Sequence, residues 1–373
     1  MLIGIICQNF PPASFEGGIS HYSLRLARAL TDRSHEVIAI TSTEFTKPND
    51  KGDGIPGLQI KLVQGPWNHQ SVREIGKIAF ANKLDALVLQ YSPASFKLSF
   101  RLMWGLIRFP CPKITAFHTL WGGKFDRLVG ILTMMGSKKI IATNSEIMTL
   151  LERHLPIFLQ KTYWIPIGSN IEPPGKKAIE VTAPKEHLLC YFGMLYPGKG
   201  LSLILDVLRE LKKRGFLFRF KFIGGGMLRS HVYEENFRKE IAAKGLQDTV
   251  EHLGLITAEE VSSWIKASRF IFLPYDSGLS DRRGSFMAAI AHGKAVLTTP
   301  PAVKMAFLKN GFNVLWPEEP SVEGFLPLIQ RLLCDDGLPA KIEKGAEELS
   351  RQFRWEKIAR DYELVLHQRS SGS

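Results

Sequence analysis

Cysteine is scarce in this chain of 373 residues, and the few cysteines present are scattered. They form no CxxC pair and have no histidine at the spacing of metal ligands; they are Cys7, Cys111, Cys190 and Cys334. Neither a disulfide framework nor a zinc site is therefore indicated. A reducing compartment such as the cytosol fits this cysteine usage best.

Long apolar runs and the motifs of nucleic-acid-binding proteins are also lacking. No stretch of about 18 apolar residues could span a membrane. The opening MLIGIICQNF lacks the basic flank of a signal peptide, so we expect neither export nor a transmembrane span. The net charge of +12 attracts polyanions, which include nucleic acid, anionic lipid and phosphorylated substrates. Because no zinc finger, RNP-type aromatic motif or basic-region heptad accompanies the charge, we expect no nucleic-acid partner.

What the chain does contain is an alternation of short apolar runs with helical spacing. Its length suits two domains, because single cores seldom grow beyond about 250–300 residues. Strand, helix and strand in close succession predict parallel βαβ units and an α/β fold. The expected strands are Leu2–Cys7, Glu36–Thr41, Leu58–Val63, Ala86–Leu89, Lys113–Phe117, Lys139–Ala142, Leu188–Phe192, Phe218–Ile223, Val250–Leu253, Phe270–Leu273 and Ala295–Thr298.

A proline-rich stretch divides these two series of elements. Residues 163–184 contain four prolines and two glycines, which is the best linker candidate in the chain. We therefore expect a first domain over 1–168 and a second over 169–353. The tail FRWEKIARDYELVL places apolar residues on one helical stripe and predicts a helix over 354–369 that packs against another element.

Three strand ends carry glycines. Gly17 and Gly18 stand between a strand and a helix, Gly193 begins a loop that ends at Lys199, and Gly224 lies in FIGGGM. Glycines permit close backbone approach, and a helix N-terminus offers N–H groups to an anion. A lysine beside such a terminus suits a phosphate, whereas an isolated loop lysine is usually solvated. FIGGGM lacks the GxGxxG spacing of a dinucleotide fingerprint, which disfavours a Rossmann dehydrogenase.

Charge is concentrated in the stretch DSGLSDRRGSFMAAIAHGKAV, which follows a buried strand. Arg282 and Arg283 directly precede Gly284 and Ser285, where a small-residue helix begins. Two guanidinium groups at a helix N-terminus make a strong site for a diphosphate. The alternative is a solvated charge cluster, balanced by the acids of the same stretch.

Two further features have a functional and a structural interpretation. His118 follows an expected strand, at the edge where ligands bind in open α/β sheets, or it is a histidine satisfied within the core. Residues 95–109 interleave cations with aromatic residues, as interfacial helices do, or form a domain helix with one buried face. The second reading is favoured for 95–109, although the positive charge leaves peripheral membrane contact open.

Taken in order, these motifs resemble the GT-B glycosyltransferases, specifically family 4 of the retaining, nucleotide-sugar-dependent enzymes. The resemblance covers nearly the whole chain. The stretches that carry it are PPASFEGGISHYSLRLARALTDRSHEV, FHTLW, IPIGSNI, YFGMLYPGKG, FIGGG, VEHLGLITAEEVSSWIKASRFIFLPY, AHGKAVLTT, NGFNVLW and FRWEKIARDYELV. It implies two Rossmann-like, doubly wound domains facing a cleft, with acceptor bound mainly by the first and nucleotide sugar mainly by the second. It also implies that the last helix crosses back to the first domain.

The resemblance also implies roles for individual residues and no metal or other cofactor. Cationic groups and helix dipoles would stabilise the leaving diphosphate in place of a metal. The groups expected in catalysis are His118, Asp276, Lys199 and Arg283. The residues expected to bind the donor are Gly17, Gly18, Gly193, Lys199, Gly224, Leu255, Ile256, Arg282, Arg283, Gly284 and Ser285.

Two departures from the family pattern matter. Met194 stands where the family usually has an arginine that contacts the diphosphate, and Ala288 stands where the second of two glutamates usually holds the ribose. Eight residues before Ala288 lies Ser280, which is not an acid. We take Asp276 as the first choice for the missing acid and Asp281 as the second.

The expected function is transfer of a sugar from a nucleotide diphosphate-sugar to a polysaccharide, glycolipid or small metabolite, in the cytosol or at the inner membrane face. One rival is a GT-B phosphorylase or synthase that uses a sugar phosphate. A second is a non-catalytic protein that binds sugar nucleotides, and a third is nucleic-acid binding through the basic surface. The base, the sugar, the acceptor and the oligomeric state are not fixed by the sequence.

Overall fold

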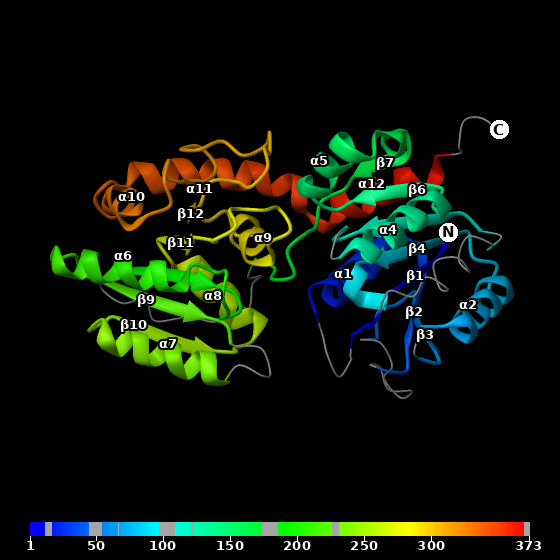
Figure 1. The fold of residues 1–373 in the computed structure, drawn as a ribbon, viewed down its shortest axis with the longest axis horizontal. Helices are drawn as coiled ribbons and strands as arrows, with labels where there is room; N and C mark the ends of the chain where they lie inside the picture. The colour runs from blue at the N-terminus through cyan, green and yellow to red at the C-terminus, as the bar shows by residue number, and fades with distance from the viewer. Residues whose placement is uncertain are drawn as a thin grey trace. The chain divides into compact units, whose positions relative to one another are not determined.

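The computed structural model describes residues 1–11, 17–44, 54–65, 67–96, 109, 111–120, 123–173, 186–225 and 231–368. The chain forms two compact units (Figure 1). The N-terminal unit comprises Met1–Asn170 together with Trp355–Ser373, and the C-terminal unit comprises Ile171–Arg354. Most of the 95–109 segment lies outside the described residues. Among the described helices, none combines the length and the apolar character needed to span a membrane.

A parallel sheet forms the centre of the N-terminal unit. In the described part of the chain it has seven strands, in the order β3-β2-β1-β4-β5-β6-β7. Neighbouring strands run parallel throughout. The strands are β1 (Leu2–Ile6), β2 (Glu36–Ser42), β3 (Leu58–Val63), β4 (Ala86–Tyr91), β5 (Lys113–Phe117), β6 (Lys139–Ala142) and β7 (Thr162–Trp164).

Helices cover both faces of this sheet, and each face has its own apolar core. One core joins the sheet to α1 (Gly18–Thr31) and α12 (Trp355–His367). The other joins it to α2 (His69–Ala81), α4 (Lys124–Gly136) and α5 (Ser145–His154). Two short 3₁₀ helices, η1 (Pro93–Phe96) and η2 (Pro156–Lys161), contribute to the second core. The near-continuous apolar strands follow from this burial on both faces.

The C-terminal unit repeats the design with a five-stranded parallel sheet in the order β10-β9-β8-β11-β12, as far as the described residues show. Its strands are β8 (His187–Phe192), β9 (Phe218–Ile223), β10 (Val250–Gly254), β11 (Phe270–Leu273) and β12 (Val296–Thr298). Its helices are α6 (Leu201–Lys213), α7 (His231–Ala243), α8 (Ala258–Ala267), α9 (Gly284–Ala291), α10 (Val322–Cys334), α11 (Gly337–Ser350) and η3 (Arg351–Phe353). The two sheets confirm the expected α/β fold.

The C-terminal helix α12 belongs to the N-terminal unit, as expected (Figure 1, red). Tyr362 of α12 shares a hydrogen bond of 2.9 Å with Tyr22 of α1, hydroxyl to hydroxyl. The Trp355 indole donates to the Ser169 carbonyl at 2.7 Å. The stripe of apolar residues on this helix therefore completes the core on one face of the N-terminal sheet.

One strand is missing from the sequence prediction. β7 lies partly within the stretch that the prolines mark as linker, and it pairs only with β6 in the described sheet. A three-residue edge strand is too short for its periodicity to be recognised. The units divide between Asn170 and Ile171, inside the same proline-rich stretch.

Candidate functional site

The ends of β8, β9 and β10 meet in the C-terminal unit through their glycines. The Gly193 amide donates to the Ile223 carbonyl at 2.9 Å, and the Gly224 amide donates to the Gly254 carbonyl at 3.0 Å. A Cβ atom on Gly224 would lie 2.2 Å from the Gly193 carbonyl oxygen, so no other residue fits. His252 Nε2 lies 2.8 Å from the Gly224 carbonyl oxygen and secures the turn.

The loop between β8 and α6 is fixed against the end of β11. Gly200 precedes α6 with a φ of 67°, and a Cβ atom there would lie only 1.8 Å from the Pro274 carbonyl oxygen. Glycine is needed both for the left-handed conformation and for this close approach. The contact places the preceding residue, Lys199, beside the residues that follow β11.

Lys199 is a buried cation, with 8% of its surface exposed. Its Nζ lies 4.8 Å from the centre of the Tyr196 ring and 5.5 Å from that of Tyr275. Burial lowers the pKa of Lys199, and the positive charges of Arg283 and Arg282 add to that effect. In the described part of the chain no ion pair joins Lys199 to a carboxylate. A buried charge of this kind calls for an anion.

Arg283 lies on the other side of the same tyrosine. Its guanidinium carbon is 4.9 Å from the centre of the Tyr275 ring, and its Nη2 donates to the Ser277 hydroxyl at 2.8 Å. Its Nε is buried and has no hydrogen-bond partner among the described residues. The hydroxyls of Tyr275 and Ser285 are 2.6 Å apart, which fixes the first turn of α9 against the end of β11.

These groups together form a cationic corner, which we define as Lys199, Arg283, Gly284 and Ser285 around Tyr275. Arg283 is the N-cap residue of α9, so the free N–H groups of the first turn point away from the helix beside the guanidinium. Two cations and a helix N-terminus attract an anion with more than one charge. The corner is therefore suited to a diphosphate.

The remaining predicted residues of this unit lie around the corner. Arg282 and Asp276 are exposed, whereas Asp281 is fully buried. Leu255 is 82% exposed and Ile256 is partly buried; Leu255 is near enough to fill the space where a Cβ atom on Gly225 would lie. These two residues therefore follow β10 at the same edge of the sheet as the corner.

Sequence reasoning missed Tyr196 and Tyr275. Tyr275 is fully buried, and both tyrosines contact Lys199. Tyr275 follows the buried strand β11 by two residues, and Tyr196 lies within the glycine loop. An aromatic residue at a strand end is a weak signal, because its contact with a cation depends on a loop about 80 residues away in the sequence.

His118 occupies the carboxyl edge of the N-terminal sheet, directly after β5. Its Nε2 lies 2.8 Å from Gln90 Oε1, and its ring meets that of Tyr22 edge-on at 4.8 Å. Burial lowers the pKa of His118 to about 3, so the ring is neutral near pH 7. Because an amide oxygen only accepts, Nε2 carries the proton and Nδ1 is left as an acceptor. Both interpretations of His118 are thus compatible with its placement.

Gly17 and Gly18 lie at the start of α1, where Gly17 is the N-cap residue. The Gly17 φ of −120° is open to any residue, and nothing described lies within 4 Å of a Cβ atom on Gly18. The fold of the described residues therefore does not require glycine here. Among the described residues, no atom occupies the space beside Gly18 in the first turn of α1. The Ser20 hydroxyl in that turn is buried and has no hydrogen-bond partner among the described residues.

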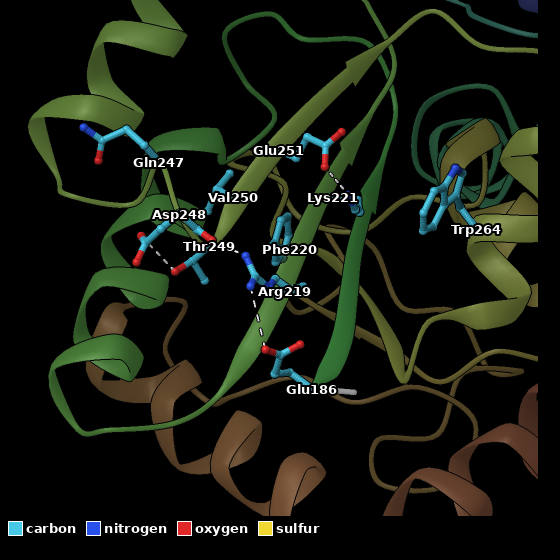
Figure 2. Close-up of a pocket in the computed structure, with 10 residues that line it drawn as sticks. All are labelled: Glu186, Arg219, Phe220, Lys221, Gln247, Asp248, Thr249, Val250, Glu251 and Trp264. Atoms are coloured by element: carbon cyan, nitrogen blue, oxygen red, sulfur yellow. Dashed lines mark hydrogen bonds and ion pairs between the residues drawn. The ribbon is translucent and has the colours of Figure 1, made fainter. Parts of the chain in front are cut away.

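A cavity of about 400 Å³ lies elsewhere in the C-terminal unit, along β9 and β10 (Figure 2). None of the predicted site residues lines it. Its cations are paired, Lys221 with Glu251 and Arg219 with Glu186, as the dashed lines show. This cavity therefore lacks the unpaired positive charge of the cationic corner. No cluster of three or more His, Cys, Asp or Glu that could hold a metal occurs within the described ranges.

Two family models match, and together they span most of the chain. The model of glycosyltransferase family 4 matches residues 16–172, and the model of glycosyl transferases group 1 matches residues 175–349. The chain belongs to the GT-B glycosyltransferases of the family 4 type. The two matches meet in the stretch where the units divide.

The matching curated relatives include the putative colanic acid biosynthesis glycosyltransferase WcaL of Escherichia coli strain K12 and that of Salmonella typhimurium. Each is 26% identical over 177 residues, which is 45% of this chain and 42% of the relative. The match thus spans less than half the length of these relatives. It supports the family assignment without extending to the whole protein.

Solved structures share the fold over nearly the whole chain. Sucrose-phosphate synthase from Thermosynechococcus elongatus aligns with a TM-score of 0.73 at 17% identity, covering 98% of each chain. Anabaena Alr3699/HepE in complex with UDP-glucose aligns with a TM-score of 0.73 at 16% identity, covering 98% of this chain and 99% of that one. At these identities the likeness establishes the GT-B fold.

Met194 and Ala288, the two residues that depart from the family pattern, both lie in the C-terminal unit. Ala288 is fully buried in α9, so no polar side chain occupies the position of the second glutamate. Met194 is 44% exposed, and its carbonyl accepts from the Tyr191 hydroxyl at 3.1 Å. The cations near the expected diphosphate position therefore come from Lys199 and from the residues before α9.

Proposed function

We propose that this GT-B protein is a retaining glycosyltransferase that uses a nucleotide diphosphate-sugar. The observation that carries the proposal is Lys199, a buried cation without a carboxylate partner among the described residues, beside Arg283 and the N-terminus of α9. A diphosphate supplies the missing negative charge. The Anabaena relative of the same fold, which was solved with UDP-glucose, makes UDP-glucose the first donor to test.

In the proposed reaction the bond between the sugar C1 and the diphosphate oxygen breaks, and a bond from C1 to an acceptor oxygen forms. Lys199 and Arg283 stabilise the negative charge that develops on the leaving diphosphate, with the N–H groups of Gly284 and Ser285. Retention places the acceptor on the face that the leaving group departs from. A phosphate oxygen can then take the acceptor proton, and Asp276 remains the candidate for a protein acid near the sugar.

In this proposal His118 acts only through hydrogen bonds, because its ring is neutral. A neutral ring that donates from Nε2 to Gln90 can accept a hydrogen bond from a sugar hydroxyl at Nδ1. It cannot supply a positive charge near pH 7. Gly17 and Gly18 leave room at the start of α1 for phosphate or sugar. We assign the acceptor mainly to the N-terminal unit and the donor mainly to the C-terminal unit.

Arginine substitutions test the donor site. Arg283→Ala should weaken binding of UDP about 10- to 100-fold, because a hydrogen bond to a charged group contributes about 1.5–3 kcal/mol. The exposed Arg282→Ala should have a smaller effect. Arg214→Ala, an exposed arginine at the end of α6, is the matched control and should bind UDP as the parent does. Calorimetric titration measures all three, and unchanged affinity in both Arg282→Ala and Arg283→Ala would reject the site.

Product analysis tests the reaction class. We would test a panel of nucleotide sugars as donors, with colanic-acid-type saccharides as acceptors. The WcaL relatives suggest these acceptors, and polysaccharide biosynthesis is the expected process. A retaining hexosyltransferase gives a product with the anomeric configuration of the donor, which NMR reads directly. Full transfer in the presence of EDTA would agree with metal independence. Transfer from a sugar 1-phosphate with release of inorganic phosphate, and no transfer from nucleotide sugars, would favour the phosphorylase alternative.

The non-catalytic alternative has one observation in its favour, the buried Ala288 at the ribose position. It predicts binding of UDP without turnover of any donor across the panel. We propose that the active enzyme is located in the cytosol and makes peripheral contact with the inner face of the membrane. The net charge of +12, which attracts anionic lipid head groups, supports that location.

A further inference from the structure

The cavity along β9 and β10 lies on the charged face of the C-terminal sheet (Figure 2). Along β9, Arg219 and Lys221 alternate with buried phenylalanines. One of these, Phe222, packs edge-on against Phe237 of α7 with ring centres 4.8 Å apart, so the phenylalanine side of β9 belongs to the core. Because successive side chains of a strand point to opposite faces, Arg219 and Lys221 lie on the other side, where they line the cavity.

The cavity is separate from the cationic corner. Glu186 directly precedes β8 and Thr249 directly precedes β10, so the lining residues lie toward the amino ends of the strands. Lys199 and Arg283 of the corner follow the carboxyl ends of β8 and β11. In a parallel sheet these ends lie at opposite edges. A ligand in this cavity would therefore not occupy the donor site.

One wall of the cavity combines an aromatic ring with a carboxylate. Lys221 Nζ lies 5.2 Å from the centre of the Trp264 ring and is paired with Glu251 Oε2. The Lys221 side chain is only 16% exposed, whereas that of Glu251 is 59% exposed. Within the described residues, Glu251 Oε1 has no hydrogen-bond partner. The lysine thus holds the carboxylate beside the indole and leaves one carboxylate oxygen free to accept from a ligand.

The facing wall supplies further donors and acceptors. Arg219 Nη2 lies 3.7 Å from Glu186 Oε1, and Arg219 Nη1 donates to the Asp248 carbonyl. The side chains of Arg219 and Glu186 remain 47% and 33% exposed. Gln247 adds an exposed amide, which can both donate and accept. Planar polar groups on this wall therefore face an aromatic group on the other.

The charges of the cavity nearly cancel. Two cations and three carboxylates line it, which leaves a formal charge of −1. A phosphate would find its cations already paired, and the described ranges hold no cluster of acids, histidines and cysteines suited to a metal. An uncharged sugar has hydroxyls that donate and accept, and it has an apolar C–H face that can pack on an indole. The volume of about 400 Å³ is within the range of small-molecule sites.

A second cavity makes the site longer than one sugar. It has a volume of about 570 Å³ and adjoins the first, because Glu186 lines both. It adds apolar surface from Phe216 and from Leu217, which is 76% exposed. We call the two cavities together the β9 groove. We propose that the β9 groove binds a chain of uncharged sugars, at a site separate from the donor site. The choice of a saccharide over other uncharged polar ligands rests on the proposed function, because a glycosyltransferase meets saccharide chains.

Native electrophoresis through gels that contain a soluble neutral polysaccharide tests the groove without any nucleotide. The probes are dextran, amylopectin, galactomannan and glucomannan. At least one of them should slow the parent protein relative to a gel without polysaccharide, and the dependence on polysaccharide concentration gives the affinity. Unchanged mobility of the parent in all four gels would overturn the proposal.

Trp264 variants test the aromatic wall. Trp264→Ala should weaken the binding about fivefold, because the ring that packs on the sugar is lost. Trp264→Phe should keep most of the affinity, because a ring remains. The matched control is Trp316→Ala, which removes a partly buried indole of the same unit that lines neither cavity. Melting temperatures verify folding, and parent-level affinity in a folded Trp264→Ala would contradict the proposal.

Glu251→Ala tests the opposite property, a hydrogen bond from a sugar hydroxyl. It should weaken binding about tenfold, as expected for a hydrogen bond to a charged group. Because Glu251 is exposed, this variant also serves if Trp264→Ala unfolds. Glu348→Ala, an exposed glutamate of α11 outside the groove, is its control and should bind like the parent. Equal affinity in the two glutamate variants would contradict the assigned acceptor.

Calorimetric titration with UDP separates this proposal from the proposed function. Trp264→Ala and Glu251→Ala should bind UDP as the parent does, because neither residue lies at the cationic corner. A parent that binds a polysaccharide but not UDP would reject the donor site and keep the β9 groove. Loss of UDP affinity in both groove variants would overturn the separate site. So would self-association without saccharide that Trp264→Ala abolishes, because it would assign the face to a second copy.

Discussion

At the scale of single residues, two lysines of the C-terminal unit differ in one decisive respect. Lys221 lies over the Trp264 ring at 5.2 Å and is paired with Glu251. Lys199 lies over two tyrosine rings and has no acid partner in the described part of the chain. Both side chains are shielded from water, but only Lys199 keeps its charge available. Its missing counter-charge is the reason that we propose Lys199 as a group that binds the donor diphosphate.

His118 provides a prediction of pH-dependent stability. Its pKa is about 3 in the folded protein and 6.5 ordinarily, so the unfolded chain binds more protons between these values. Stability should therefore fall as the pH decreases below 6.5, by about 1.4 kcal/mol per pH unit from this group. Urea unfolding at about pH 7.5 and pH 5 should show about 2 kcal/mol less acid destabilisation for His118→Gln than for the parent. Equal acid destabilisation in both proteins would mean that His118 is not held neutral.

At the scale of elements, the loop between β8 and α6 links glycine chemistry to the placement of Lys199. Gly198 and Gly200 both have positive φ, at 90° and 67°. A Cβ atom on Gly198 has nothing described within 4 Å, whereas one on Gly200 would collide with the Pro274 carbonyl. Both positions therefore disfavour a side chain through their positive φ, but they differ in the space around a Cβ atom.

Alanine substitutions at Gly198 and Gly200 separate the effect of backbone strain from the effect of a steric collision. Gly198→Ala should cost about 1–2 kcal/mol in unfolding free energy, the penalty of a left-handed conformation. Gly200→Ala should cost more and should also weaken UDP binding about tenfold or more, because the loop that holds Lys199 must move away from β11. Urea unfolding and calorimetric titration measure the two effects. Equal UDP affinity in both variants would show that this contact does not position the lysine.

At the scale of the whole molecule, the last helix of the chain is part of the first folding unit. Ile358, Tyr362 and Val365 of α12 are buried in the core that contains α1. Two chain segments distant in sequence thus complete one core. The core of the N-terminal unit is therefore incomplete without α12.

Truncation after Arg354 tests this dependence. Each large apolar side chain that loses its burial removes about 1.5–3 kcal/mol, and three of them approach the total stability of a domain. Calorimetry should show loss of the unfolding transition of the N-terminal unit, while the C-terminal unit still unfolds cooperatively. The matched control removes only residues 369–373, which keeps all of α12, and should unfold like the parent. An unchanged N-terminal transition after the larger truncation would contradict the shared core.

The sequence by itself determined the α/β class, all but one of the described strands, the family and the stretches around the site. Those features depend on local periodicity, turn residues and motif order, which a linear chain displays directly. β7 was not predicted, because a strand of three residues is too short to show an alternating hydrophobic pattern.

Only the tertiary structure decided which side chains meet. In the folded chain Tyr196 and Tyr275 contact Lys199. Asp281 is buried whereas Asp276 is exposed, and His118 is buried beside Gln90. The physical reason is that burial, pairing and the pKa of a group depend on neighbours supplied by other elements, and the linear order of residues does not specify those neighbours.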